Sequence, residues 1–398
     1  MMMTSTGRTS SASTRAMAGE RPRPRILYLV TEDWYFCSHR LPVARAARDA
    51  GFEVVVATRV QDHGTQITDE GFRLVPLRWQ RRSLHPWREL RVVAEVAGVY
   101  RHEKPDLVHH VALKPAVYGS VAARLARVPA AVNTVAGLGY VFTSRQWKAR
   151  ILGGILKAAF RSLLKRPNVR IILQNPDDRD LFAALCKPRP EQMVLIRGSG
   201  VDVEHFVPRP QPDDVVVTMV SRMLWNKGVG DLVEAAKRLR GAGEPVRFLL
   251  VGSPDPENPA SIPESQLTAW QEAGHVEWLG HRTDVADIWA RSAIAVLPTT
   301  YGEGVPKCLL EAAACGRPII ATDTAGCREI VRDGENGLLV PTGDPGALVD
   351  AIRRLSRDPA MRADMGAKGR ELVIGHFSED TVVRQTMDVY RSLVEIER

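Results

Sequence analysis

The chain has 398 residues, of which 44% are hydrophobic and 25% charged, a composition that suits a globular protein with two ordinary domains. No apolar run approaches the roughly 20 residues that a membrane-spanning helix needs. The five cysteines are scattered and form no Cys-x-x-Cys pair, which excludes a disulfide framework or a cysteine metal site and favours reduced intracellular thiols.

Positive charge is concentrated in one region. The formal net charge is +8, yet no Asp or Glu occurs from Leu107 to Pro176, where eleven Lys and Arg residues lie. Subtracting these eleven charges from +8 leaves the rest of the chain at about −3. No helix-turn-helix, RNP-type or zinc-finger pattern accompanies the region, so we expect no nucleic-acid partner. An anionic membrane surface or a diphosphate substrate fits the charge better.

The chain opens with a polar tail and then a βαβ unit. Residues 1–24 are rich in Ser, Thr, Arg and Pro and have no apolar h-region, which predicts a disordered tail rather than a signal peptide. The apolar runs 25–30 and 54–57 predict two strands on either side of a helix at 41–50. This order is typical of the start of a Rossmann-like domain.

The loop predicted at 31–42 lacks G-x-G-x-x-G, which argues against a dinucleotide site. It carries three aromatic residues, Trp34 among them, together with His39 and Arg40. These side chains could be packed core, but their position at the carboxyl end of a strand favours contact with a ligand.

Two adjacent histidines, His109 and His110, lie in the next strand-to-loop passage, at 105–115. Either imidazole could contact a ligand, and either could be a core histidine whose nitrogens are satisfied by neighbours. The sequence leaves these alternatives open.

A basic helix is predicted over residues 145–166, after a glycine-rich turn at 133–142 that no Gly-Lys-Ser/Thr follows, so a P-loop is excluded. The helix carries its charges on one face, formed by Arg150, Lys157, Arg161 and Lys165. It is either an ordinary core-packed helix with a solvated face or an interfacial helix on anionic lipid. The lack of acids around it favours membrane contact.

A second Rossmann-like half begins with the strand 215–220, after a proline-rich linker at 198–213. Arg222 follows this strand, and Lys227 precedes the next helix. Two fixed cations at the end of a strand suit a nucleotide diphosphate. Two further strands end at Gly252 and Gly280, whose loops would border a nucleotide base or be a plain sheet edge.

The stretch 295–318 predicts a strand, a loop, a helix that starts near Pro306, and a second strand. Glu303 lies just before the helix and Glu311 inside it. Gly304 and Val305 lie between them, where the backbone can approach a ligand and free N–H groups can face an anion. Taken alone, the two carboxylates could instead be a helix-dipole partner and a solvated residue.

The segment Tyr301-Gly-Glu-Gly-Val-Pro, followed by Leu309-Leu-Glu-Ala, resembles the Glu-x7-Glu signature of the retaining nucleotide-sugar glycosyltransferases of family 4. The resemblance implies the α/β fold called GT-B, two Rossmann-like domains facing across a cleft. It implies that Glu303 holds the donor sugar near its reacting carbon and that Glu311 binds the ribose. Arg222 and Lys227 resemble the family's Gly-Arg-Leu…Lys-Gly element, with Ser221 in place of the glycine.

The resemblance also assigns the parts of the chain. Residues 25–200 would form the acceptor domain, 201–376 the donor domain, and 377–398 a helix returning to the first domain. The family often has His-x-His where this chain has His109-His110, with Val111 at the second position. The segment Ser38-His-Arg-Leu-Pro42 resembles bacterial members that act on lipid-linked sugars, which makes Trp34, His39 and Arg40 candidates for contacting the acceptor.

We therefore expect a retaining glycosyltransferase that moves a sugar from a UDP-sugar to a lipid-diphosphate-linked glycan, on the inner face of the cytoplasmic membrane. No cofactor or metal is expected, because Arg222 and Lys227 would neutralise the leaving diphosphate. Asp178-x-Asp180 resembles a metal motif of another glycosyltransferase fold, but acids are common in the first turn of a helix without metal. The alternatives are a GT-B sugar-nucleotide epimerase and a catalytically silent sugar-nucleotide-binding protein.

Overall fold

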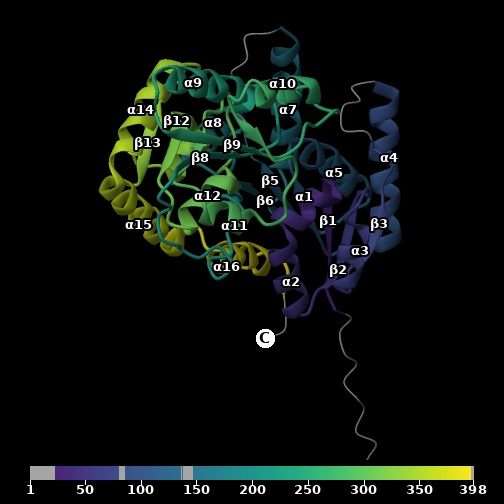
Figure 1. Ribbon diagram of the computed structural model, residues 1–398. Coiled ribbons are helices and arrows are strands. Elements are labelled where there is room, and N and C mark those ends of the chain that lie inside the picture. The colour runs from purple at the N-terminus through teal and green to yellow at the C-terminus, as the bar shows by residue number, and fades with distance from the viewer. Residues whose placement is uncertain (1–22, 80–85, 136, 138–146, 396–398) are drawn as a thin grey trace, which may run out of the picture.

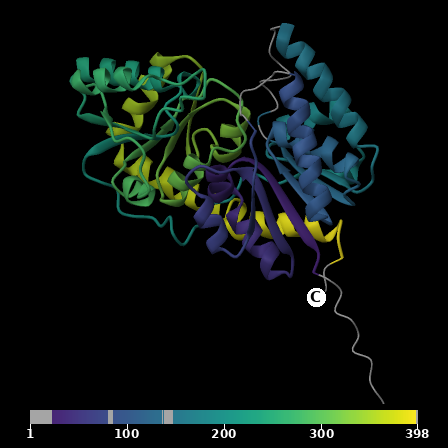
Figure 2. The same cartoon turned by 90° about the vertical axis from the view of Figure 1, so that its right-hand side faces the viewer.

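The computed structural model describes residues 23–79, 86–135, 137 and 147–395. These residues form two α/β domains, each with one parallel sheet between layers of helices (Figure 1). The first domain, in purple and blue, and the second, in green and yellow, stand side by side in both views (Figure 2). The expected fold, two Rossmann-like domains of the GT-B type, is confirmed.

The first domain is built on a seven-stranded sheet with the order β3-β2-β1-β4-β5-β6-β7. Its strands are β1 (Arg25–Glu32), β2 (Glu53–Arg59), β3 (Arg73–Pro76), β4 (Leu107–Val111), β5 (Ala130–Val135), β6 (Val169–Leu173) and β7 (Met193–Leu195). Strand β1 lies in the middle of the sheet and is covered on both faces, which explains its continuous apolar sequence.

Helices cover both faces of this sheet. One face packs against α1 (Asp33–His39), α2 (Leu41–Asp49), α3 (Gly64–Asp69) and, from the far end of the chain, α16 (Glu379–Arg391). The other face packs against α4 (Pro86–Glu103), α5 (Leu113–Leu125), α7 (Trp147–Leu163) and α8 (Pro176–Cys186). The domain thus has two apolar clusters, one on each side of the sheet.

The second domain has a six-stranded sheet with the order β10-β9-β8-β11-β12-β13. Its strands are β8 (Val215–Val220), β9 (Val246–Val251), β10 (Glu277–Trp278), β11 (Ile294–Leu297), β12 (Ile319–Thr322) and β13 (Gly337–Val340). Its helices are α9 (Val229–Gly241), α10 (Glu264–Glu272), α11 (Val285–Ala290), α12 (Lys307–Ala314), α13 (Ala325–Ile330), α14 (Pro345–Arg357) and α15 (Pro359–His376). A single apolar cluster unites them.

The chain crosses between the domains twice, at neighbouring points. Val201 and Ser378 form a parallel bridge, and the N–H of Val201 donates to the carbonyl of Phe377 while that of Glu379 donates to Val201. Beyond the second crossing, α16 packs on α2, and Figure 2 shows it in yellow beneath the purple strands of the first domain. The last helix therefore completes the core of the first domain.

The structure corrects two predicted elements. The segment after β1 is not a loop: Asp33 to His39 form the helix α1, and the buried Asp33 carboxylate accepts backbone N–H bonds from Trp34, Gln61 and His63. The predicted basic helix ends at Leu163 rather than 166. The predicted glycine-rich turn lies mostly outside the described residues.

The buried face of α7 is made by Leu156, Phe160 and Leu163, while Arg161 is exposed and Lys157 partly so. Lys165 is exposed just beyond the helix. The side chain of Arg150 lies outside the description. In the part of the chain that the structure describes, no helix is both long and apolar enough to cross a bilayer.

Candidate active site between the domains

Each sheet reverses its strand order at one point, and ligands of open α/β sheets bind in the crevice formed there. In the first domain the reversal lies between β1 and β4, and in the second between β8 and β11. The loops that follow these four strands carry the candidate residues, and both sets of loops face the space between the domains.

Arg222 follows β8 at this reversal point. Its Nη1 lies 2.6 Å from Oδ2 of Asp255, a residue of the loop after β9. Gly252 ends β9, donates its N–H to the carbonyl of Gly280 and accepts a hydrogen bond from the indole of Trp278. The two glycines thus tie the loops after β9 and β10 together behind the guanidinium of Arg222.

Lys227 forms a buried ion pair with Glu303, which comes from the loop after β11. Gly228 allows this approach: its φ is +80°, and a Cβ there would meet the carbonyl oxygen of Pro298 at 1.9 Å. The ammonium also lies 5.6 Å from the centre of the Tyr301 ring. Burial alone would lower the pKa of Lys227, but the carboxylate of Glu303, together with Tyr301 and Cys308, raises this pKa overall, so Lys227 stays protonated.

The segment of Glu303, Gly304 and Val305 is fixed by its neighbours. Gly326, at the start of α13, packs so closely that a Cβ would meet the carbonyl oxygen of Gly304 at 1.7 Å. Oε2 of Glu303 contacts Lys227, while Oε1 is sealed from solvent and has no hydrogen-bond partner among the described residues. A buried carboxylate oxygen without a donor is costly, so this side chain is poised to accept a hydrogen bond from a ligand.

Glu311 lies in α12, whereas Glu303 lies in the loop before this helix. Burial raises the pKa of Glu311 to about 7, opposed by the nearby ammonium of Lys307. Its carboxyl group can therefore change protonation near neutral pH, and a ligand that donates hydrogen bonds to it would favour the ionised form.

A cavity of about 200 Å³ lies where the two reversal points meet. The first domain contributes most of its lining and the second contributes Arg222. The lining residues are Thr31, Glu32, Trp34, Tyr35, Arg40, Val111, Ala112, Thr134, Gln174 and Arg222. Arg40 is only 3% exposed, and its Nε and Nη2 have no hydrogen-bond partner among the described residues. The cavity therefore combines an aromatic wall with polar groups of both charges.

His39 lies beside this cavity rather than in its lining. Its ring stacks on Tyr35 with centroids 4.1 Å apart, and its Nδ1 lies 2.5 Å from the hydroxyl of Ser38. Burial, with Lys307 and Arg40 nearby, holds the pKa of His39 well below its ordinary value. The ammonium of Lys307 donates to the carbonyl of Ser38 at 2.5 Å, so the end of α1 is joined to the start of α12 in the second domain.

Both adjacent histidines lie in the core. His109 contacts the hydroxyls of Tyr390 and Thr134, at 2.6 and 2.7 Å, and burial holds its pKa well below the ordinary value. His110 contacts Tyr100 and Asn133, and burial lowers its pKa to about 4. Neither ring lines the cavity, so a direct contact with a sugar would require one of these hydrogen bonds to break.

Sequence reasoning did not single out Glu32, Thr134, Gln174 or Asp255. The first three lie at or next to the carboxyl ends of β1, β5 and β6, so a search for polar residues at the carboxyl ends of predicted strands would have found them. Asp178 accepts hydrogen bonds from Asn175 and from the N–H of Gly137, within the capped start of α8. Among the described residues, no three His, Cys, Asp or Glu side chains are grouped as metal ligands.

Two protein-family models match the sequence of this chain, one over each domain. Residues 25–175, which carry most of the cavity, match a model described as "Glycosyl transferase 4-like". Residues 214–358, which carry Arg222, Lys227, Glu303 and Glu311, match one described as "Glycosyl transferases group 1". The chain belongs to the group 1 glycosyltransferases.

Relatives of this glycosyltransferase align along most of its length. It is 25% identical to the N,N'-diacetylbacillosaminyl-diphospho-undecaprenol alpha-1,3-N-acetylgalactosaminyltransferase of Campylobacter jejuni, over 89% of this chain and 95% of that protein. It is 26% identical to the UDP-Gal:alpha-D-GlcNAc-diphosphoundecaprenol alpha-1,3-galactosyltransferase of Escherichia coli, over 79% and 82%. The Anabaena protein HepE, solved in complex with UDP-glucose, has a similar fold, with a TM-score of 0.72 and 20% identity, over 93% and 100%.

Proposed function

We propose that this glycosyltransferase transfers a sugar from a UDP-sugar to the sugar of a lipid-diphosphate acceptor, in the assembly of a cell-surface glycan. The observation that carries the proposal is the ion pair of Lys227 and Glu303, which lies in the same domain as Arg222, the residue of that domain that lines the cavity. The relatives support it, because the names of two of them specify diphospho-undecaprenol acceptors and one of these also specifies a UDP-sugar.

The donor would lie on the second domain. Arg222 and Lys227 would bind the diphosphate, Glu303 a hydroxyl of the donor sugar, Glu311 the ribose, and the loops at Gly252 and Gly280 would border the base. The bond between the sugar's C1 and the β-phosphate oxygen breaks, the acceptor's hydroxyl oxygen takes that place, and its proton passes to the leaving phosphate. The two cations stabilise the charge that develops on the diphosphate. The family resemblance implies retention of configuration at C1.

Metal independence follows from the same two cations. They can neutralise the diphosphate at the point where a divalent ion would otherwise do so, and no cofactor is needed for the displacement. Transfer should therefore persist in EDTA. An absolute requirement for Mg²⁺ or Mn²⁺ would contradict this part of the proposal.

The acceptor sugar would occupy the cavity, against Trp34 and near Arg40. A cavity of about 200 Å³ suits a single sugar ring rather than a nucleotide. His39 would act indirectly, by fixing α1 against Lys307. His109 would support the cavity through its hydrogen bond to Thr134, which lines it, and His110 would support the same strand through Asn133, the residue before Thr134.

A membrane surface is the third expected partner. Trp87 and Leu90, near the start of α4, are 71% and 59% exposed. Helix α5 packs against both α4 and α7, so this apolar pair and the basic residues Lys157 and Arg161 belong to one helical layer of the first domain. Cations and exposed apolar side chains together suit the surface of an anionic bilayer, such as the inner face of the cytoplasmic membrane.

The deciding experiment incubates the protein with several UDP-sugars and a panel of sugar diphosphates on a lipid, and identifies products by mass. We expect one new glycosidic bond and free UDP, formed with EDTA present. An epimerase would instead convert the UDP-sugar without any acceptor, and a silent binding protein would bind UDP without turnover.

A further inference from the structure

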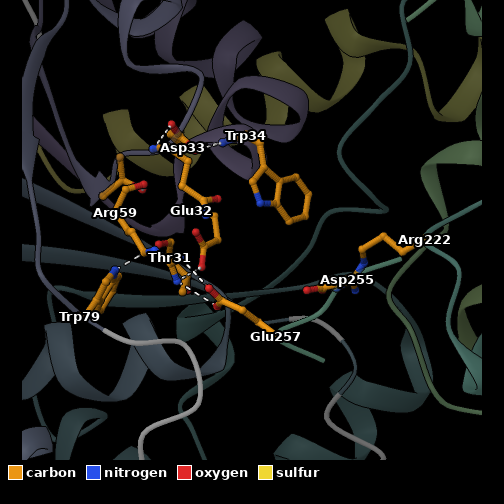
Figure 3. A network of polar contacts seen from close by, with 11 residues as sticks. Thr31, Glu32, Asp33, Trp34, Arg59, Trp79, Arg222, Asp255 and Glu257 are labelled. Carbon is orange, nitrogen blue, oxygen red and sulfur yellow. Dashed lines mark hydrogen bonds and ion pairs between the residues drawn. The ribbon is translucent and has the colours of Figure 1, made fainter. Parts of the chain in front are cut away.

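Glu32 is a carboxylate in the wall of the cavity, and the proposed function gives it no role. It is the last residue of β1, is 3% exposed, and lies next to Asp33 and Trp34 (Figure 3). Burying a carboxylate costs free energy unless charge and hydrogen bonds compensate it. Its position at the strand-order reversal of the first domain is where a ligand is expected.

Arg59 supplies part of this compensation. It is the residue of β2 paired with Glu32 across the sheet, and its Nη1 lies 3.7 Å from Oε1 of Glu32. The same guanidinium makes a bidentate contact with Glu257 of the second domain, at 2.9 and 2.5 Å. Two parallel bonds of this kind fix the plane of a guanidinium. Arg59 thus stands between a carboxylate of each domain, as Figure 3 shows.

The loop that carries Glu257 also holds the donor-side arginine. Asp255, two residues earlier, pairs with Arg222. The loop is bound to the segment after Arg222 by hydrogen bonds from the N–H of Met223 to Ser253, of Trp225 to Ala260, and of Ile262 to Met223. One short loop therefore connects Arg222 to Arg59, and through Arg59 to Glu32.

We propose that the carboxylate of Glu32 accepts a hydrogen bond from a hydroxyl of the acceptor sugar, and that Arg59 and Glu257 hold it in place. This rests on the proposed function, in that the cavity receives the acceptor. A carboxylate has about four lone-pair sites, so Glu32 can accept a bond from a hydroxyl in addition to its contact with Arg59 and its other protein contacts. Because Glu257 belongs to the other domain, the subsite is complete only while the domains are together.

The test measures binding by calorimetry on UDP-saturated protein. The probe is the tightest binder among alkyl diphosphates of α-GlcNAc, α-GalNAc and α-glucose, with its 3-, 4- and 6-deoxy analogues. We expect the wild type to bind one deoxy analogue about ten- to a hundredfold more weakly than the parent sugar. Glu32→Gln should bind the parent and that analogue alike, with unchanged affinity for UDP. A loss that is equal for every analogue, or no loss, would overturn the proposal.

A second set of variants changes Arg59 and Glu257, which are partly exposed, in case Glu32→Gln does not fold. Arg59→Met and Glu257→Gln should each weaken acceptor binding about two- to fivefold, and the double variant should bind the acceptor no more weakly than Arg59→Met alone. Asp177→Asn is the matched control, because Asp177 and Arg328 form an ion pair between the domains that does not involve the cavity. If Asp177→Asn weakens acceptor binding as much, Arg59 and Glu257 only join the domains.

Measuring acceptor binding and sugar transfer separately distinguishes a failure of this inference from a failure of the proposed function. Should the wild type bind a sugar diphosphate through Glu32 yet transfer nothing to it, the proposed function fails while the subsite stands. Should transfer occur with every deoxy analogue bound equally by wild type and Glu32→Gln, the function stands and the subsite is wrong.

Discussion

The proposed donor and acceptor halves of the cleft differ in how their charged side chains are paired. On the donor side each cation has a carboxylate partner from its own domain, Arg222 with Asp255 and Lys227 with Glu303. On the acceptor side Arg40 is buried with two nitrogens unpaired among the described residues, and Arg59 depends on Glu257 of the other domain. Among the described residues, the ion pairs of the proposed donor half thus lie within one domain, whereas Arg59 on the other side pairs across the two domains.

The largest expected effect comes from removing a cation of the proposed donor half. Lys227→Met leaves Glu303 as a buried, unpaired carboxylate and removes a cation from the leaving diphosphate, so kcat/KM for transfer should fall about a hundred- to a thousandfold. Steady-state kinetics at limiting UDP-sugar measure the loss. Lys237→Met is the matched control, because Lys237 is an exposed lysine of the adjacent α9, and it should retain wild-type rates. Wild-type turnover in Lys227→Met would refute the donor assignment.

Membrane contact should also distinguish the two domains, because we expect only the first domain to bind a lipid surface. A basic residue near an anionic surface contributes about 1 kcal/mol, so changing Lys157, Arg161 and Lys165 to Glu should weaken liposome binding about a hundredfold or more. Co-sedimentation with anionic vesicles measures this, and the binding should weaken as salt rises. Transfer to a short soluble acceptor should change little. Unchanged co-sedimentation would mean that the basic face of α7 is merely solvated.

The protonation of Glu311 offers a test within the donor half. Its pKa of about 7 is raised by burial, and hydrogen bonds from ribose hydroxyls would favour the ionised form. UDP binding should therefore tighten as pH rises from 6 to 7 and level off above 7, by up to about tenfold. Calorimetry at several pH values checks this. Glu311→Gln, which keeps only the ionisation of UDP itself, should lose this part of the pH dependence.

The smallest effect concerns the aromatic wall of the acceptor half. Trp34→Ala removes apolar surface against the acceptor sugar, and we expect the acceptor KM to rise about fivefold while UDP affinity stays constant. Trp87→Ala is a useful comparison, since that tryptophan is exposed and is not among the residues that line the cavity. An equal rise for a soluble acceptor in both variants would place the acceptor sugar elsewhere.

The donor half could be predicted from the sequence because its residues follow one another closely along the chain. Arg222 and Lys227 are five residues apart and Glu303 and Glu311 eight, so a motif and the positions of strand ends were enough. The structure adds that Glu303 pairs with Lys227, a contact across 76 residues. No local pattern encodes that distance.

The residues of the proposed acceptor half could not be predicted from the sequence in this way. Glu32, Arg59 and Glu257 meet through the register of β1 on β2 and through the orientation of one domain against the other. The environment of His109 depends on Tyr390, 281 residues later in the chain, so the sequence could not tell a ligand contact from a satisfied core histidine. The helix α1 has only seven residues, too few to show the hydrophobic repeat of a helix, so the sequence predicts a loop there.

The neighbouring crossings at Val201 and Ser378 make the first domain a candidate for excision. Its core needs α16, so a fragment that stops at residue 200 would leave the apolar side of α2 bare and expose Tyr28 and His109 to water. Joining residue 200 directly to 379 would bypass the whole second domain at a point where the two backbones already touch. Such a graft gives a rule for building chimaeras: exchange everything between the two crossings, and every residue that lines the cavity except Arg222 stays with the part that remains.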